Sequence, residues 1–138
     1  MIVETEGGVS MIWCVEDDSS IRDIEVYALT STGLEAKGFE DGDSFWKALQ
    51  SEKPDLVVLD VMLPGKDGVT LLKLMKESED FRHIPVIMAT AKGTEYDKIQ
   101  SLDLGAEDYC RSGEILSGGS GLFSRVFSGL SGTGTLSG

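Results

Sequence analysis

The stretch that most constrains the fold is residues 56–65, which read Leu-Val-Val-Leu-Asp-Val-Met-Leu-Pro-Gly. A short apolar run that is rich in β-branched residues and closed by turn signals is typical of a strand buried on both faces of a parallel sheet. Asp60 then stands at the carboxyl end of that strand. Because open α/β sheets bind their ligands at this edge, a carboxylate placed there predicts chemistry rather than loop solvation.

The rest of the chain alternates between strand and helix patterns. Four further apolar runs predict strands, at residues 9–15, 34–39, 85–89 and 105–110. The segments between them have helical spacing. Five strands that alternate with helices imply parallel strands, right-handed crossovers and a three-layer α/β sandwich.

Helix starts and inward faces can be predicted from caps and periodicity. We expect Asp18 or Ser19 to cap the first helix and Asp43 to cap the second. The predicted inward faces are the apolar residues at helical spacing, namely Ile21, Ile24, Ala28 and Leu29, then Phe45, Ala48 and Leu49, then Leu71, Leu72 and Met75. A fourth helix is marked by Tyr96, Ile99 and Leu102.

Composition narrows the class of protein. The 138 residues fit one domain, and 12 basic against 24 acidic residues give a net charge of -12. This charge disfavours nucleic acid or an anionic membrane as a direct partner. No apolar stretch approaches the roughly 20 residues of a membrane span, and the amino end lacks a signal-peptide pattern. We therefore predict a soluble, cytoplasmic protein.

Three regions differ in pattern. Residues 1–8 are expected to be a leader and 9–111 the domain core. In residues 112–138, 15 of 27 residues are Gly or Ser, which is typical of a flexible linker, although apolar spacing at 121–131 indicates a weak last helix. Cys14 and Cys110 fall in the first and fifth strands, too far apart to bridge, and are expected to be buried free thiols.

Three carboxylates are expected to share one cleft. Glu16 and Asp17 end the first strand and Asp60 ends the third. Three such groups repel one another unless a cation neutralises them or a pKa rises, and hard oxygen ligands at this edge suit Mg²⁺. The sequence therefore predicts a magnesium site for phosphoryl chemistry. Asp60 would be the nucleophile that forms an aspartyl-phosphate, and the hydroxyl of Thr90, at the end of the fourth strand, would contact another phosphoryl oxygen.

Four segments together carry a family resemblance. They are Val15-Glu16-Asp17-Asp18, Leu59-Asp60-Val61-Met62-Leu63-Pro64-Gly65, Met88-Ala89-Thr90-Ala91 and Gly105-Ala106-Glu107-Asp108-Tyr109. In order and spacing, over roughly residues 9–111, they resemble the signatures of response-regulator receiver domains. The Glu-Asp pair and the Leu-Pro-Gly turn resemble the branch that joins a receiver to a winged-helix DNA-binding domain, and we expect no such output domain within these 138 residues.

The resemblance implies a flavodoxin-like sheet of order 2-1-3-4-5. It makes Asp60 the phosphoacceptor, with Glu16, Asp17 and the backbone carbonyl of Met62 as further metal ligands. It also implies that Thr90 and Ala91 contact the phosphoryl group, that Thr90 and Tyr109 form the pair that reorients on phosphorylation, and that a sensor histidine kinase is the phosphoryl donor. The protein would then be a signalling domain rather than an enzyme.

One departure stands out. The family places a phosphoryl-contacting Lys, followed by Pro, three residues beyond the tyrosine position, and this chain has Ser112-Gly113 there. Loss of the ammonium removes a charge-assisted contact of roughly 1.5 to 3 kcal/mol. We expect Asp60 still to accept phosphate while the coupling of phosphorylation to the fifth strand and its surface is weakened or lost. The coincident change in composition suggests that residues 112–138 are not the native continuation, through a frame change, a redesign or an added tail.

Other functions stay open at this point. They are a non-signalling receiver scaffold with an altered carboxyl end, a phosphatase with an aspartyl nucleophile, and a flavin-binding module. Such a phosphatase commonly carries a second acid two residues after its nucleophile, where this chain has Met62. A homodimer through the fourth and fifth helix face, or one that swaps the last helix, is also compatible with the sequence.

Overall fold

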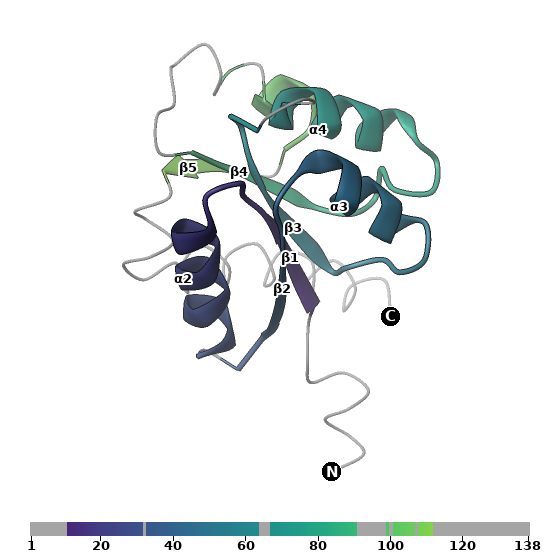
Figure 1. The fold of residues 1–138 in the computed structure, drawn as a ribbon. Helices are drawn as coiled ribbons and strands as arrows, with labels where there is room; N and C mark the ends of the chain where they lie inside the picture. Colours follow the sequence, from purple (N-terminus) through teal and green to yellow (C-terminus); the bar gives the residue numbers. More distant parts are fainter. Residues whose placement is uncertain are drawn as a thin grey trace, which may run out of the picture.

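The computed structural model describes residues 11–31, 33–63, 67–90, 99, 101–106 and 108–111. Its strands form one parallel sheet in the order β2-β1-β3-β4-β5 (Figure 1). The strands are β1 (Met11–Val15), β2 (Glu35–Phe39), β3 (Leu56–Asp60), β4 (Val86–Thr90) and β5 (Asp108–Arg111). The predicted parallel sheet and the order of its first four strands are confirmed.

The central strand β3 is buried along its whole length. It pairs with β1 on one side, with Val15 opposite Leu59, and with β4 on the other, with Asp60 opposite Ala89. A strand with neighbours on both edges and helices on both faces needs apolar side chains in both directions, and this explains the unbroken run that precedes Asp60.

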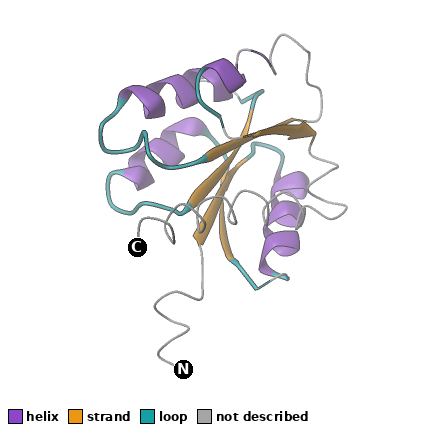
Figure 2. Cartoon of the chain, turned by 180° about the vertical axis from the view of Figure 1, so that it is seen from behind, coloured by secondary structure: helices purple, strands orange, loops and turns teal. Residues whose placement is uncertain are grey.

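Helices cover both faces of the sheet (Figures 1 and 2). Helix α2 (Ser19–Thr30) packs on one face, and α3 (Gly42–Leu49) and α4 (Gly68–Glu77) lie on the other. Two apolar clusters result, one on each face of the sheet. The first includes Trp13, Phe45, Leu49, Leu71, Leu72 and Met75, and the second includes Ile12, Cys14, Leu29, Leu56, Val58 and Ile87. The fold is therefore a flavodoxin-like three-layer sandwich.

The predicted inward face of α2 is confirmed at Leu29 and is wrong at Ile24. Ile24 is 48% exposed, and Ile21 and Ala28 are only half-buried. The fully buried side chains of this helix are Glu25 and Leu29. The helix is thus rotated relative to the apolar pattern, so that Glu25 faces inward in place of its neighbour Ile24.

Of the two predicted helix caps, one agrees with the structure. Asp18 caps α2, accepting hydrogen bonds from the amides of Ser20 and Ile21. The expectation that Asp43 caps α3 is wrong, because the cap is Asp41, whose extended backbone lets its carboxylate accept from the amide of Ser44 at 2.7 Å. Asp43 lies in the first helical turn instead. The third helix, α4, begins after Asp67, which accepts from the amide of Thr70.

Several sequence predictions fall outside the described residues. These are the leader at 1–8, the segment 112–138 with its last helix at 121–131, and the side chain of Cys110. Of the predicted fourth helix, residue 99 and residues 101–103 are described, and they are helical. Cys14 is a buried free thiol, as predicted. Among the described helices, none is both long and apolar enough to cross a lipid bilayer.

Candidate functional site

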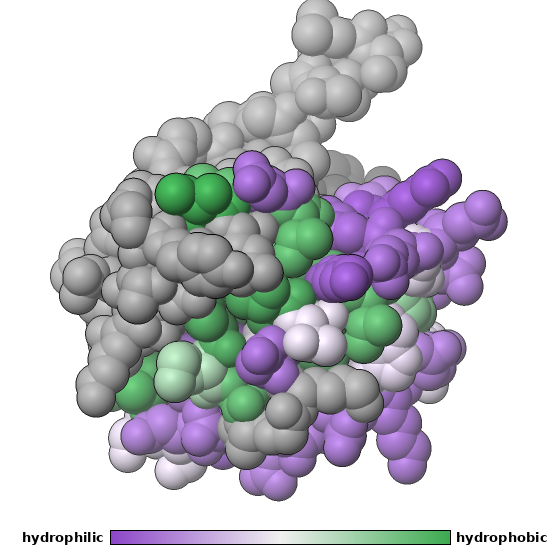
Figure 3. Space-filling model, turned by 90° about the horizontal axis from the view of Figure 1, so that it is seen from above, coloured by the Kyte–Doolittle hydropathy of each residue, from purple (hydrophilic) through white to green (hydrophobic). Residues whose placement is uncertain are grey.

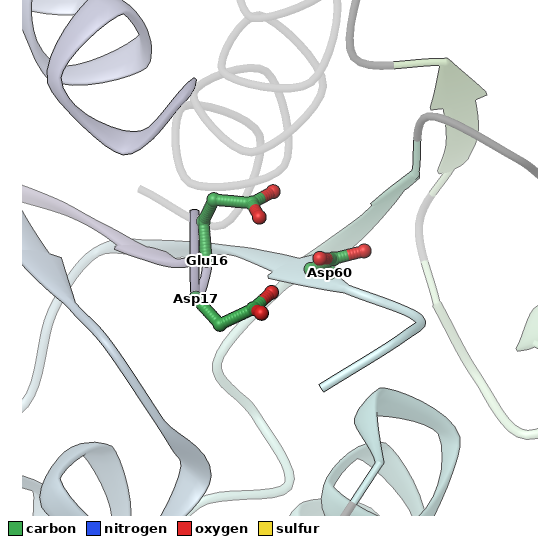
Figure 4. Close-up of side chains that lie close together, drawn as sticks. All are labelled: Glu16, Asp17 and Asp60. Carbon is green, nitrogen blue, oxygen red and sulfur yellow. The ribbon is translucent and has the colours of Figure 1, made fainter. Parts of the chain in front are cut away.

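Three carboxyl groups converge at the carboxyl edge of the sheet (Figure 4). Glu16, Asp17 and Asp60 each offer one oxygen, and these atoms all lie within 4.8 Å of one another. Glu16 is 5% exposed and Asp60 is 8% exposed, whereas Asp17 lies at the surface. The cluster is therefore partly enclosed by protein and open to solvent on the side of Asp17.

Strand pairing brings the acidic pair to Asp60. Because β1 and β3 are parallel and Val15 lies opposite Leu59, the residue after Val15 emerges beside the residue after Leu59. The loop that follows β1 is then held in place by hydrogen bonds. The amide of Glu16 donates to the carbonyl of Phe39 at 2.9 Å, and the amide of Asp18 donates to Glu16 Oε2 at 3.1 Å.

Asp60 is fixed by the turn that follows it. Its Oδ1 accepts a hydrogen bond from the amide of Met62 at 3.1 Å. The turn returns to the sheet edge, where the amide of Gly68 donates to the carbonyl of Val61 at 2.9 Å. A Cβ on Gly68 would lie 2.0 Å from the carbonyl oxygen of Asp60, so only glycine lets α4 begin this close to β3.

The electrostatics of the cluster favour protons or a cation. Burial raises the pKa of Glu16, and the neighbouring Asp60 and Glu25 raise it further. Burial also raises the pKa of Asp60, with the charge of Asp17 adding to the effect. The ionised forms of Glu16 and Asp60 are thus destabilised by loss of water and by like charges nearby. A proton held by the cluster, or a bound cation, would relieve this destabilisation.

The donor set fits a hard divalent cation. Mg²⁺ binds through one or a few carboxylates while it keeps several of its waters, and it needs room on one side for them. Here two enclosed carboxylates face one exposed carboxylate. A cation would offset the repulsion that otherwise raises the pKa values of Glu16 and Asp60. The residues present are therefore suited to Mg²⁺ or a similar ion.

The remaining predicted site residues are placed in part. Thr90 ends β4 at the same sheet edge as Asp60, and its side chain is outside the described residues, as are Ala91 and Ser112. Tyr109 lies on β5 and packs half-buried against the main apolar cluster. The side chain of Met62 is 61% exposed.

Two residues on α2 were missed by the sequence analysis. Glu25 is 2% exposed, and burial, with the charge of Asp60 adding to it, raises its pKa to about 7. Arg22 is half-buried and donates from Nη1 to the carbonyl oxygen of Glu16 at 2.7 Å. Helical periodicity counts apolar residues, so it gives no signal for a charged side chain on an inward face.

Figure 3 shows one face of the molecule, seen from above. Apolar residues gather towards its middle, and hydrophilic residues lie along its right and lower margins.

Comparison with known proteins identifies the fold and the family. Residues 12–111, which include all three carboxylates, match the response regulator receiver domain. The chain belongs to this family. The predicted family resemblance is thereby confirmed.

Two kinds of similar protein, a curated relative and solved structures, support this receiver assignment. The phosphate regulon transcriptional regulatory protein PhoB of Klebsiella pneumoniae is 42% identical over 98 residues, which cover 71% of this receiver chain and 43% of PhoB. The Mn²⁺-bound form of response regulator Rcp1 superposes with a TM-score of 0.73 and 26% identity, covering 80% of this chain and 92% of Rcp1. The phosphorylated cyanobacterial phytochrome response regulator RcpA gives 0.75 and 25%, covering 83% and 91%. The receiver chain thus spans less than half the length of its curated relative.

Proposed function

We propose that this chain is a phosphoacceptor receiver domain that takes a phosphoryl group on Asp60. The observation that carries the proposal is the convergence of Glu16, Asp17 and Asp60 within 4.8 Å at the end of the central strand. The similarity to RcpA, which was crystallised in a phosphorylated form, supports it. We assign the function to the core at residues 9–111.

The reaction is an in-line transfer. A carboxylate oxygen of Asp60 attacks phosphorus, a new O–P bond forms, and the bond from phosphorus to the donor breaks. If the donor is a phosphohistidine, the P–N bond electrons leave with the imidazole. A ring that is protonated on its other nitrogen departs as neutral imidazole. The product is an acyl phosphate, which water later hydrolyses.

Glu16, Asp17, Asp60 and the backbone carbonyl of Met62 are the proposed ligands of Mg²⁺. When bound, Mg²⁺ neutralises carboxylate and phosphoryl charge so that an anionic nucleophile can meet an anionic phosphoryl group. The carboxylates of Glu16 and Asp17 supply negative charge that would hold the ion beside Asp60. The Met62 amide orients Asp60 by its hydrogen bond to Oδ1 at 3.1 Å, leaving the other carboxylate oxygen free of that contact.

The proposed phosphoryl contacts and switch residues follow from their positions in the sequence and the sheet. Thr90 and Ala91 are proposed to contact the phosphoryl oxygens, and Thr90 with Tyr109 to form the switch. Thr90 lies on the strand next to Asp60, at the same edge, and this supports its part of the proposal. Ser112 occupies the position of the missing Lys, so we propose that phosphorylation alters the surface less than in relatives that have this Lys. If phosphorylation did not alter the surface at all, the chain would be a receiver scaffold that no longer signals.

The proposed partner is a sensor histidine kinase in the cytoplasm. A receiver core receives its phosphoryl group from a partner's phosphohistidine, and this role needs no catalytic turnover of a small substrate. A phosphatase activity is disfavoured, because the residue two positions after Asp60 is Met62, whose exposed thioether cannot protonate a leaving group. Homodimer formation through the fourth and fifth helix face remains a prediction.

Intact-mass spectrometry tests the proposal. The full chain is incubated with phosphoramidate, with Mg²⁺ or with a chelator, alongside Asp60→Asn and Asp80→Asn. Asp80 is an exposed acid in the segment that follows α4 and serves as the matched control. We expect one added phosphoryl group in the unchanged chain and in Asp80→Asn, only with Mg²⁺. A phosphorylated Asp60→Asn would overturn the proposal.

A further inference from the structure

Arg22 reaches from α2 to the loop that carries the acidic pair. Its Nη1 donates to the carbonyl oxygen of Glu16 at 2.7 Å and more weakly to that of Asp17 at 3.5 Å. Both acceptors are backbone atoms. Arg22 therefore holds the chain from which the two carboxylates project, rather than the carboxylates themselves.

The peptide groups around Glu16 are held on both sides. The amide of Glu16 donates to the carbonyl of Phe39 on β2 at 2.9 Å, and its carbonyl accepts from Arg22. The next anchor is Asp18, which caps α2 and whose amide donates to Glu16 Oε2. With these contacts removed at one side, the backbone of Glu16 and Asp17 would be free to rotate, and the carboxylates would turn with it.

Gly38 on β2 makes room for the Arg22 side chain. A Cβ placed on Gly38 would lie 2.7 Å from Cγ and 2.8 Å from Cδ of Arg22. Gly38 pairs with Cys14 on β1, so the aliphatic stem packs against the outer strand β2 at a position without a side chain. A methyl group at this position would displace the stem and, with it, the guanidinium.

Arg22 acts through geometry rather than through its charge. Its guanidinium donates to the backbone carbonyl oxygens of Glu16 and Asp17, which are neutral acceptors. A substitution that keeps the positive charge but loses the planar fork should therefore fail to restore the site fully.

We propose that Arg22, seated on Gly38, is a positioning residue that holds the backbone of Glu16 and Asp17 so that their carboxylates meet Asp60 around a divalent cation. The inference rests on the proposed function. Groups that orient the ligands of a metal typically account for a 10- to 100-fold difference in metal affinity. We expect loss of the guanidinium to weaken Mg²⁺ binding about 10-fold, at the low end of this range.

Cation binding and phosphorylation of the full chain test the inference. Mn²⁺ binding is measured by electron paramagnetic resonance and Mg²⁺ binding by competition, for the unchanged chain, Arg22→Met, Arg22→Lys and Asp23→Asn. Asp23 is an exposed neighbour on α2 and is the control. Arg22→Met keeps an aliphatic stem without donors. We expect it to bind Mg²⁺ about 10-fold more weakly and to need correspondingly more Mg²⁺ for half-maximal phosphorylation, with a rate close to normal at saturation. The Mg²⁺ affinity of Arg22→Lys should lie between that of the unchanged chain and that of Arg22→Met.

A double-substitution cycle separates positioning from general loss of stability. Gly38→Ala should weaken Mg²⁺ binding in the unchanged chain, but not in an Arg22→Ala background, where no stem is left to displace. Normal Mg²⁺ affinity in both Arg22→Met and Arg22→Lys, or fully additive effects in the cycle, would overturn the inference while leaving the proposed function intact. Absence of Mg²⁺ binding in the unchanged chain would overturn both. Circular dichroism shows whether each variant is folded. If Arg22→Met does not fold, the Mg²⁺ affinity of Arg22→Lys tests the inference in its place.

Discussion

At the scale of single residues, the least expected feature is a glutamate inside the core. Glu25 is 2% exposed on the inward face of α2, where burial, and then the charge of Asp60, raises its pKa to about 7. Its carboxyl group is therefore protonated in the folded state over a pH range in which the unfolded chain has lost the proton. Such a group links folding stability to pH.

We predict that Glu25→Gln removes part of the pH dependence of folding. The folded pKa of Glu25 is raised from 4.5 to about 7, so its stabilising effect is complete below pH 4.5 and is lost as the pH rises through 7. The loss amounts to about 3 kcal/mol. Urea unfolding without divalent cations, between pH 4 and pH 8, should show a flatter curve for Glu25→Gln and an unchanged one for the exposed Glu35→Gln. Parallel curves for Glu25→Gln and the unchanged chain would show that Glu25 has no such linkage.

At the scale of elements, the start of α4 against the end of β3 holds Asp60 in place. Gly68 begins α4 with its Cα packed on the Asp60 carbonyl, at an ordinary negative φ, so its role is to leave space rather than to allow an unusual backbone. Gly42 begins α3 in an equivalent position, but the atom that a Cβ would meet there is the end of the Leu71 side chain. Backbone cannot move aside as a side chain can.

We predict that Gly68→Ala lowers the free energy of unfolding by about 3 kcal/mol, because the added methyl group would lie 2.0 Å from a backbone oxygen. Gly42→Ala is the matched control, and the rotation of Leu71 should limit its cost to about 1 kcal/mol. Urea denaturation of both variants measures the difference. Equal losses would contradict the packing argument.

The elements also show how far sequence reasoning extends. The run before Asp60 predicted the buried central strand, and parallel pairing then predicted that Glu16 and Asp17 would meet Asp60, because strand ends meet at one edge. Glu25 and Arg22 could not be found this way. Their positions depend on how α2 is rotated against the sheet, and the seat of Arg22 depends on Gly38, which is distant in sequence. Only tertiary packing supplies that information.

At the scale of the whole molecule, a net charge of -12 and an enclosed acidic cluster both oppose folding in the absence of cations. A ligand that binds only the folded state stabilises it by about 2.7 kcal/mol at 100 times its Kd. A specific divalent site should therefore be visible in the stability of the entire chain.

We predict that saturating Mg²⁺ raises the free energy of unfolding at pH 8 by about 2 to 3 kcal/mol and that a chelator reverses the effect. Asp17→Asn should lose most of this gain, whereas Asp23→Asn should retain it. Sodium chloride at matched ionic strength controls for general screening of the negative charge. If sodium chloride stabilises the chain as much as Mg²⁺ does, there is no specific site.

Identification of the phosphorylated residue tests the central claim most directly. After reaction with phosphoramidate and Mg²⁺, borohydride reduction converts an aspartyl phosphate to homoserine, and peptide sequencing by mass spectrometry gives its position. We predict homoserine at residue 60 alone. Reduction at residue 16 or 17, or no reduced residue despite normal folding, would contradict it.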